Sequence, residues 1–360
     1  MVMPDGLPLD EISRLLVWTA VAIYALAFIA YAIDLGRRSD IAIQQKDAAK
    51  QRELVGAVAG ISASGSTARG GSLGEMRAEQ QAAKAELEAP LARRTRYLWA
   101  RIGTSLTVRG FLFHVAGDVL RGVASGRVPW SNMYEFALTG TMLIVAVYLV
   151  VLFKYDLRFL GTFITGLVVV LLGGTVIWFY TAVVPLSDPL KSVWLVIHVF
   201  VASLATALFA LAFALSVLQL MQTRRERLAI AALSASDEAV AAAPRRRGLR
   251  FLRTLPAGDV LEALAYRFTI IGFIFWTFTL IAGSIWANDA WGRYWGFDTK
   301  EVWTFVIWVL YAGYIHARAT RGWRGTRSAW LSIVGFAAVM FNFTIVNLFF
   351  KGLHVYSGLN

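Results

Sequence analysis

Apolar runs of 18 or more residues recur along this chain of 360 residues, and each is long enough to cross a bilayer as an α-helix. Hydrophobic residues make up 58% of the sequence. Charged residues make up 16%, whereas a soluble domain carries roughly 25%. The pattern predicts an all-α, polytopic bundle of membrane helices.

The apolar runs predict about eight membrane-spanning helices. The first lacks a small-residue cleavage pattern, so we expect it to remain as a membrane helix. We divide the chain into a first helix (1–35), a cytoplasmic linker (36–97) whose second half reads as a charged surface helix, and a transmembrane core (98–360). Within the core we expect a cytoplasmic loop at 222–264 and an external loop at 288–302. The predicted spans are 14–35, 98–120, 133–153, 159–183, 193–220, 266–287, 303–319 and 328–350.

Lysine and arginine predict the orientation of these helices. Loops on one side hold 25 of them, in 37–96, 222–264, 317–327 and 154–158, and loops on the other side hold five. Loops rich in Lys and Arg remain in the cytoplasm, so we expect both termini and the 288–302 loop outside. The net charge of +12 is explained in the same way, and no nucleic acid partner is expected.

The external loop contains the stretch WGRYWGFDTKEVW, from Trp291 to Trp303. A belt of interfacial aromatic residues, with Asp298 capping the next helix, would explain such a loop structurally. The density of rings favours a second explanation, a shelf for a flat, apolar ligand, for which haem is the leading candidate. We expect the glycines to let rings or the ligand pack against the backbone, and the basic residues to pair with haem propionates. The candidate residues are Trp286, Trp291, Gly292, Tyr294, Trp295, Gly296, Phe297 and Asp298, with Arg293 and Lys300 as the basic pair.

The loop has no histidine, so iron ligands must come from elsewhere, and the chain has four histidines and no cysteine. His198 lies near the outer end of its predicted span, and His354 lies just past the outer end of the last. These two predict a bis-histidine haem site beside the loop, although a histidine at a helix end also serves as an ordinary polar residue. His316 lies near the inner end of its span, and His114 lies deeper in another. Because these two histidines differ in depth, they should not bind one haem together, and a partner ligand for His316 is expected on another chain. For His114 the alternative is an interhelical hydrogen bond.

Several motifs resemble one family. WGRYWGFDTKEVW is similar to the tryptophan-rich "WWD" signature of haem-handling proteins of cytochrome c maturation. PWSNMYEF (129–136), WLVIHV (194–199), YIHARATRGWRG (314–325) and GLHVYSG (352–358) resemble the CcsA/ResC family, subunits of the system II cytochrome c synthase. The resemblance covers about 98–360. In this chain Phe297 stands where the signature commonly has Trp, and Thr299 where it has Pro.

The resemblance implies a membrane enzyme subunit, a holocytochrome c synthase, in the bacterial inner membrane. It works with a CcsB/ResB partner, attaches haem b to the thiols of a CxxCH motif in apocytochrome c, and depends indirectly on a thioredoxin-like thiol reductant. His198 and His354 match the external haem ligands, His316 matches the histidine within the membrane, and the loop matches the haem-binding segment. Asn132 and Glu135 are weaker candidates from the PWSNMYEF motif.

Two alternatives remain open. One is a haem exporter without ligation activity, which would use the same residues. The other is a membrane cytochrome b that transfers electrons, although such proteins place paired histidines at matched depths.

Overall fold

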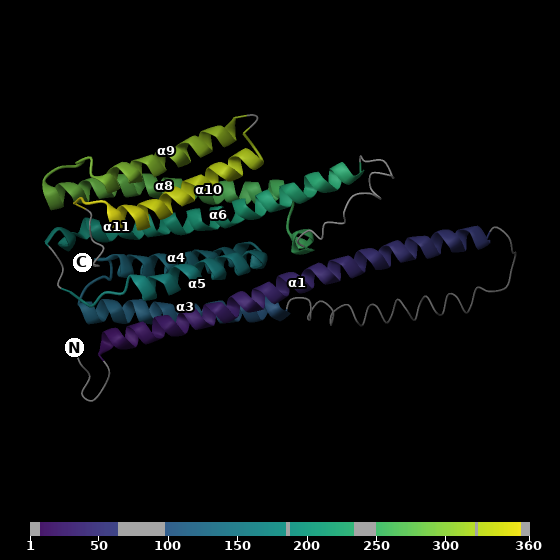
Figure 1. The fold of residues 1–360 in the computed structure, drawn as a ribbon, viewed down its shortest axis with the longest axis horizontal. Helices are drawn as coiled ribbons and strands as arrows, with labels where there is room; N and C mark the ends of the chain where they lie inside the picture. Colours follow the sequence, from purple (N-terminus) through teal and green to yellow (C-terminus); the bar gives the residue numbers. More distant parts are fainter. Residues whose placement is uncertain (1–7, 64–97, 185–187, 234–249, 321–322, 354–360) are drawn as a thin grey trace.

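The computed structural model describes residues 8–63, 98–184, 188–233, 250–320 and 323–353. Within these ranges only the backbone is described at 39–63, 188–189, 232–233 and 250. All regular secondary structure in the described part of the chain is helical (Figure 1). The longer helices are α1 (Leu9–Ala63), α3 (Leu98–Ser125), α4 (Met133–Lys154), α5 (Gly161–Trp178), α6 (Val193–Leu233), α8 (Gly258–Trp291), α9 (Thr299–Ala319) and α10 (Thr326–Phe341). The short ones are η1 (Arg158–Leu160), η2 (Asp188–Lys191), η3 (Arg250–Thr254), the π-turn η4 (Asn342–Val346) and α11 (Asn347–Phe349).

Six of the described helices are long and apolar enough to cross a membrane, which makes this a polytopic membrane protein. They include the predicted spans except 98–120 and 303–319. Those two segments do form helices, α3 and α9, that run alongside the others (Figure 1). Charged residues in α3, and Trp, Tyr and His residues in α9, lower their hydropathy. The prediction of eight spans is therefore confirmed for six.

The first helix is longer than predicted. We expected it to end at residue 35, but α1 continues to Ala63, so the first half of the predicted linker is helical. Residues 37–55 contain no proline or glycine and are rich in Ala, Gln, Arg and Lys, which favour helix. The surface helix expected in the second half of the linker lies outside the described residues.

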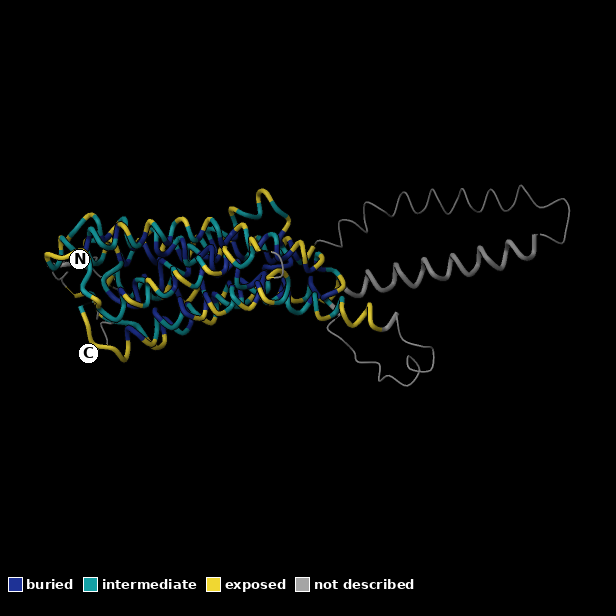
Figure 2. The backbone as a smooth tube through the Cα atoms, turned by 90° about the horizontal axis from the view of Figure 1, so that it is seen from above, coloured by how far each residue is buried: buried dark blue, intermediate teal, exposed yellow. Residues whose placement is uncertain are grey.

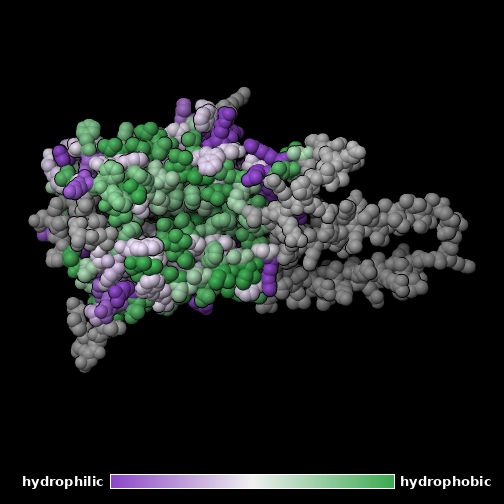
Figure 3. Space-filling model, in the orientation of Figure 1, coloured by the Kyte–Doolittle hydropathy of each residue, from purple (hydrophilic) through white to green (hydrophobic). Residues whose placement is uncertain are grey.

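The helices form two groups that pack along their length. In Figure 1, α1, α3, α4 and α5 lie in the lower half, and α6, α8, α9 and α10 lie in the upper half. The strongest packing is between α6 and α8 and between α1 and α3, while α4 against α6 joins the groups. Buried residues run through the middle of the bundle (Figure 2). On the face that Figure 3 shows, hydrophobic residues cover the middle and hydrophilic ones gather toward the ends.

Three glycines of α3 at intervals of seven explain its close contact with α1. A Cβ on any of them would come within 2.9 Å of a side chain of α1. Small residues let membrane helices approach closely, and the seven-residue repeat matches the antiparallel run of large residues on α1. The pairs are Gly103 with Tyr31, Gly110 with Tyr24, and Gly117 with Val17.

Candidate functional site

His198 lies in the second turn of α6, against one face of α8. Its Nδ1 is 3.0 Å from the backbone carbonyl oxygen of Thr279, and its half-buried ring stacks on Trp286 at 5.9 Å with an interplanar angle of 15°. A carbonyl oxygen only accepts hydrogen bonds, so Nδ1 donates and the lone pair of the neutral ring is on Nε2. Histidines that ligate metals commonly hold their other nitrogen in this way.

The tryptophan-rich loop is shorter than predicted, because both flanking helices extend into it. Helix α8 continues to Trp291, and α9 begins at Thr299, so the irregular segment is 292–298. The two glycines of this segment have different surroundings. Gly292 has φ +70° and ends α8 in the left-handed conformation, with its N–H bonded to the Asn288 carbonyl at 2.8 Å and nothing within 4 Å of a built Cβ. Gly296 instead makes room for the Arg293 guanidinium.

The aromatic rings of this region divide into an inner pair, one buried and one partly buried, and an outer group. Trp286 is buried, and Trp291 packs against it edge to face at 4.9 Å. Trp295 packs edge to face with Phe297, which is 80% exposed and has φ +56°. A phenylalanine in the left-handed region costs about 1–2 kcal/mol, and such strained residues gather at functional sites. Tyr294 is also exposed. Trp286 of the inner pair contacts His198.

The carboxylates of Asp298 and Glu301 hold the loop together. The predicted capping box is confirmed at the start of α9. Glu301 also accepts the backbone N–H of Gly296 at 2.8 Å. Asp298 Oδ1 accepts the backbone N–H of Leu353 at 3.2 Å, and a Cβ on Gly352 would overlap the Asp298 carboxylate. The end of the described chain is therefore bound directly to the loop.

His354 lies outside the described residues. It follows Leu353 directly in the sequence.

Lys300 lies partly buried in the first turn of α9, whereas Arg293 of the loop is exposed. The Lys300 ammonium donates to Asn347 Oδ1 at 2.6 Å, and burial lowers its pKa to about 8, against the opposing effect of Asp298. Asn342 lies five residues before Asn347, and its amide contacts Thr304 Oγ1 at 3.4 Å. The π-turn η4 begins at Asn342 and ends just before Asn347, and such turns are frequent at functional sites.

Three cavities meet at His198 and Lys300. The largest has a volume of about 390 Å³ and lies between α4 and α5 on one side and α6, α8 and α10 on the other. Its lining is mainly apolar, and it also includes Trp276, Trp178 and Phe343. A cavity of about 70 Å³ lies toward Trp286, Tyr294 and Trp295, and one of about 100 Å³ lies toward Trp130 and Asn132. The structure thus brings His198, Lys300 and the loop to one place.

The other two described histidines lie elsewhere. His114 is fully buried, with Nε2 3.0 Å from the Leu138 carbonyl and Nδ1 3.4 Å from the Tyr24 hydroxyl, so the interhelical hydrogen bond predicted as its alternative is confirmed. His316 is exposed in the last turn of α9, the helix that starts at the loop. Neither histidine is among the described residues that line the three cavities at His198.

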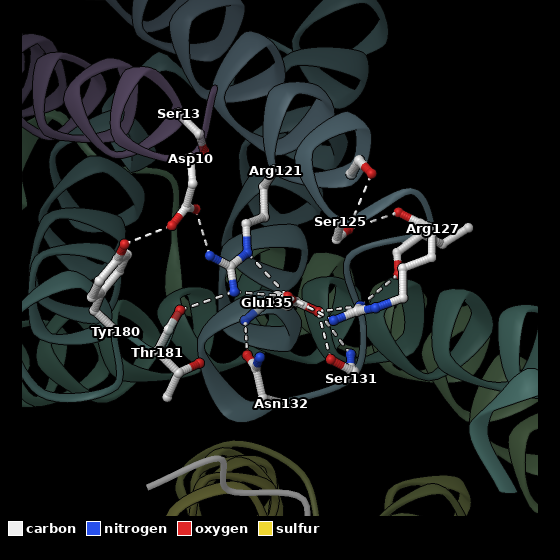
Figure 4. A network of polar contacts seen from close by, with 12 residues as sticks. Asp10, Ser13, Arg121, Ser125, Arg127, Ser131, Asn132, Glu135, Tyr180 and Thr181 are labelled. Atoms are coloured by element: carbon white, nitrogen blue, oxygen red, sulfur yellow. Dashed lines mark hydrogen bonds and ion pairs between the residues drawn. The ribbon is translucent and has the colours of Figure 1, made fainter. Parts of the chain in front are cut away.

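The weaker candidates Asn132 and Glu135 have structural partners. The Asn132 side chain accepts the N–H of Glu135 at 2.9 Å and caps α4. The fully buried Glu135 carboxylate pairs with Arg121 at 2.9 Å and Arg127 at 2.7 Å (Figure 4). Arg121 also pairs with Asp10 at 2.5 Å, so this network ties α1 to α3 and α4.

Sequence reasoning missed several groups of this site. The Thr279 carbonyl and Gly283 contact His198, Asn347 accepts from Lys300, Asn342 contacts Thr304, and Glu301 binds backbone N–H groups of the loop. Only Glu301 carried a local signal, its capping-box spacing from Asp298.

Comparison with known proteins gives the family. The cytochrome C assembly protein family model matches residues 130–354. "Cytochrome c biogenesis protein CcsA" of Guillardia theta is 33% identical over 249 residues, which cover 67% of this chain and 80% of that protein. The protein of the same name from Prochlorococcus marinus is 31% identical over 254 residues, covering 66% and 78%.

A solved structure, "Cytochrome c Heme Lyase CcmF", has a similar fold with a TM-score of 0.58 at 14% identity. The similarity covers all of this chain and half the length of that one. The family model matches well over half of the chain, and its CcsA relatives are covered for most of their length. This chain therefore belongs to the cytochrome c assembly protein family.

Proposed function

We propose that this chain binds haem through His198 and His354 on the outer side of the membrane and presents it for attachment to the CxxCH thiols of apocytochrome c. Haem is the substrate here, and the resulting activity is that of a holocytochrome c synthase subunit. One observation carries the proposal. His198 and the segment that leads into His354 both contact the tryptophan-rich region, the first through Trp286 and the second through Asp298.

The residues around His198 fit a haem. Its Nδ1 is held by a backbone carbonyl, which leaves Nε2 as the ligand nitrogen. The largest adjoining cavity is mainly apolar, and its volume of about 390 Å³ falls in the range of ligand sites. Lys300 lines that cavity and supplies a cation for a propionate, whereas Arg293 lies on the exposed side of the loop.

All eight predicted spans cross the inner membrane in this proposal, with both termini outside. The asymmetry of Lys and Arg between the two sets of loops supports it. Helices α3 and α9 support it too, because they run parallel to the six apolar helices (Figure 1).

The thiols belong to the apocytochrome and the vinyl groups to haem. In each attachment a thiol adds across a vinyl group, so the S–H hydrogen moves to carbon and no oxidant is consumed. The work of this chain is to hold the reactants in position. Bis-histidine ligation by His198 and His354 holds the iron, and the aromatic loop covers an apolar face.

A CcsB/ResB-type partner completes the complex. The exposed stripe along α9 supports this, since it runs through Val302, Phe305, Val309 and Gly313 to His316. A haem bound by the outward-facing His316 takes its second ligand from another chain.

The test is co-expression with the candidate partner and an apocytochrome, scoring covalent haem. His198→Ala should abolish attachment, and added imidazole should partly restore it, because imidazole replaces the missing ligand. Val196→Ala, on the exposed side of the same helix, is the matched control and should retain activity.

Wild-type attachment by His198→Ala would contradict the proposal. Haem reaching the outer side without attachment in the wild-type complex would favour an exporter. Reversible electron exchange with a quinol, with no effect on attachment, would favour a cytochrome b.

A further inference from the structure

Gly283 of α8 lies directly against the imidazole of His198. A Cβ built on Gly283 would be 2.7 Å from Cε1 and 2.8 Å from Nδ1 of the ring. Real Cβ atoms essentially never approach other heavy atoms to less than 3.0 Å. The imidazole can therefore occupy this place only because residue 283 has no side chain.

Because residue 283 has no side chain, the Thr279 carbonyl oxygen is also accessible to the His198 imidazole. In an α-helix the carbonyl of residue 279 accepts the N–H of residue 283, so any side chain at 283 stands beside that oxygen. The Thr279 oxygen also accepts Nδ1 of His198 at 3.0 Å. The Thr279 hydroxyl bonds to its own helix, at the Phe275 carbonyl at 2.9 Å, so it does not compete for the histidine.

Three residues on one face of α8 thus surround His198, at spacings of four and three along the helix. Thr279 supplies the acceptor, Gly283 supplies the space, and Trp286 supplies a ring stacked at 5.9 Å. The tautomer and the position of the imidazole are both set by this face.

We propose that Gly283 and the Thr279 carbonyl are positioning groups, which hold His198 as the Nδ1–H tautomer so that Nε2 ligates haem iron. The inference rests on the proposed function of His198. A hydrogen bond from Nδ1 to a carbonyl makes Nε2 a more basic ligand, and loss of such a partner costs about 10–100-fold in metal affinity.

The first test is Gly283→Ala in the full chain, co-expressed with its partner and purified with haem. Haem retention should fall about tenfold, the optical spectrum should lose its bis-histidine character, and added imidazole should restore that spectrum. The matched control is Gly272→Ala in the same helix, where a Cβ would come 2.8 Å from Cε1 of Phe209. It introduces the same kind of clash away from His198, so its spectrum should stay like wild type.

A second variant leaves the α8 backbone untouched and covers the case in which Gly283→Ala fails to fold. Replacing His198 by Nδ1-methylhistidine removes the donor but keeps Nε2. The less basic ligand stabilises ferric iron less, so the haem midpoint potential should rise.

The outcomes separate the two proposals. If His198→Ala keeps the wild-type spectrum and haem content, His198 is no ligand and the proposed function fails. If His198→Ala loses haem while Gly283→Ala and the methylated variant keep wild-type retention and potential, only the positioning proposal is overturned. An equal change in Gly272→Ala and Gly283→Ala would also overturn it, because general packing in α8 would then be the cause.

Discussion

Two polar clusters lie at the same end of the bundle and differ in what their polar groups face. The first, which we call the arginine cluster, comprises Arg121, Glu135, Arg127 and Asp10 (Figure 4). The second, which we call the histidine cluster, comprises His198, Lys300 and Trp286. The arginine cluster joins α1, α3 and α4, and the histidine cluster joins α6, α8 and α9.

In the arginine cluster each charged side chain is paired with a side chain of opposite charge from the protein itself. The side chains of Arg121 and Glu135 are both 0% exposed and lie 2.9 Å apart. Glu135 accepts further bonds from Arg127 and from the backbone N–H of Ser131. In the histidine cluster, His198 and Lys300 line three cavities that meet between the helices.

The comparison teaches that burial and unusual residue type do not distinguish a binding site from a structural one. Asn132 and Glu135 looked like site candidates in the PWSNMYEF motif, and so did His198 in WLVIHV. Glu135 forms ion pairs with two arginines, whereas His198 and Lys300 line cavities between the helices. The predictions below test this contrast.

The largest expected effect is on stability, in the arginine cluster. Arg121→Ala leaves Glu135 and Asp10 without their shared buried cation, and breaking a buried ion pair in this way costs about 3–5 kcal/mol. Denaturant unfolding of the detergent-solubilised protein measures it. Arg158→Ala, which breaks the partly exposed pair with Asp156 at 3.0 Å, is the control and should cost about 0–1 kcal/mol. Similar losses for the two variants would mean that the arginine cluster is not a structural tie.

In the histidine cluster, Lys300→Met should reduce haem retention while costing less stability than Arg121→Ala. The side chain keeps much of its volume but loses the cation. Haem content per protein and unfolding are measured on the same sample. A stability loss as large as that of Arg121→Ala, with haem retained, would reverse the assignment of the two clusters.

Wild type and Lys300→Met should also differ in how their unfolding free energy depends on pH. Burial lowers the Lys300 pKa to about 8, against an ordinary value near 10.5 in the unfolded chain. Between these values the unfolded state binds more protons, so this group makes stability rise with pH. The unfolding free energy of wild type should therefore increase relative to Lys300→Met from pH 8 to pH 10. A relative decrease in that window would contradict the lowered pKa.

The smallest effect is at the contact between the loop and the chain end. Asp298→Ala removes the acceptor for the Leu353 N–H and half of the capping box, at a cost of about 1 kcal/mol. The chain has no cysteine, so Lys351→Cys gives a single site for a nitroxide label. The label should become more mobile in Asp298→Ala and stay ordered in Asp298→Asn, which keeps an acceptor oxygen. Equal mobility in both variants would show that Asp298 does not hold this segment.

Much of the fold follows from local patterns. The apolar runs predicted helices where the structure has them, and the spacing of Asp298 and Glu301 predicted the capping box. The helix ends were less accurate, because α8 continues through aromatic residues to Trp291 and stops only at Gly292, where the left-handed conformation suits glycine.

The sequence by itself determined that this is a helical membrane protein and that its basic residues lie in particular loops. Only the tertiary structure decided which polar groups meet. His198 and Thr279 are 81 residues apart, and Arg121 and Asp10 are 111 apart, so their pairing depends on how whole helices rotate and slide against one another. The Thr279 acceptor is a backbone atom that every residue has, so no side-chain pattern in the sequence could have marked it.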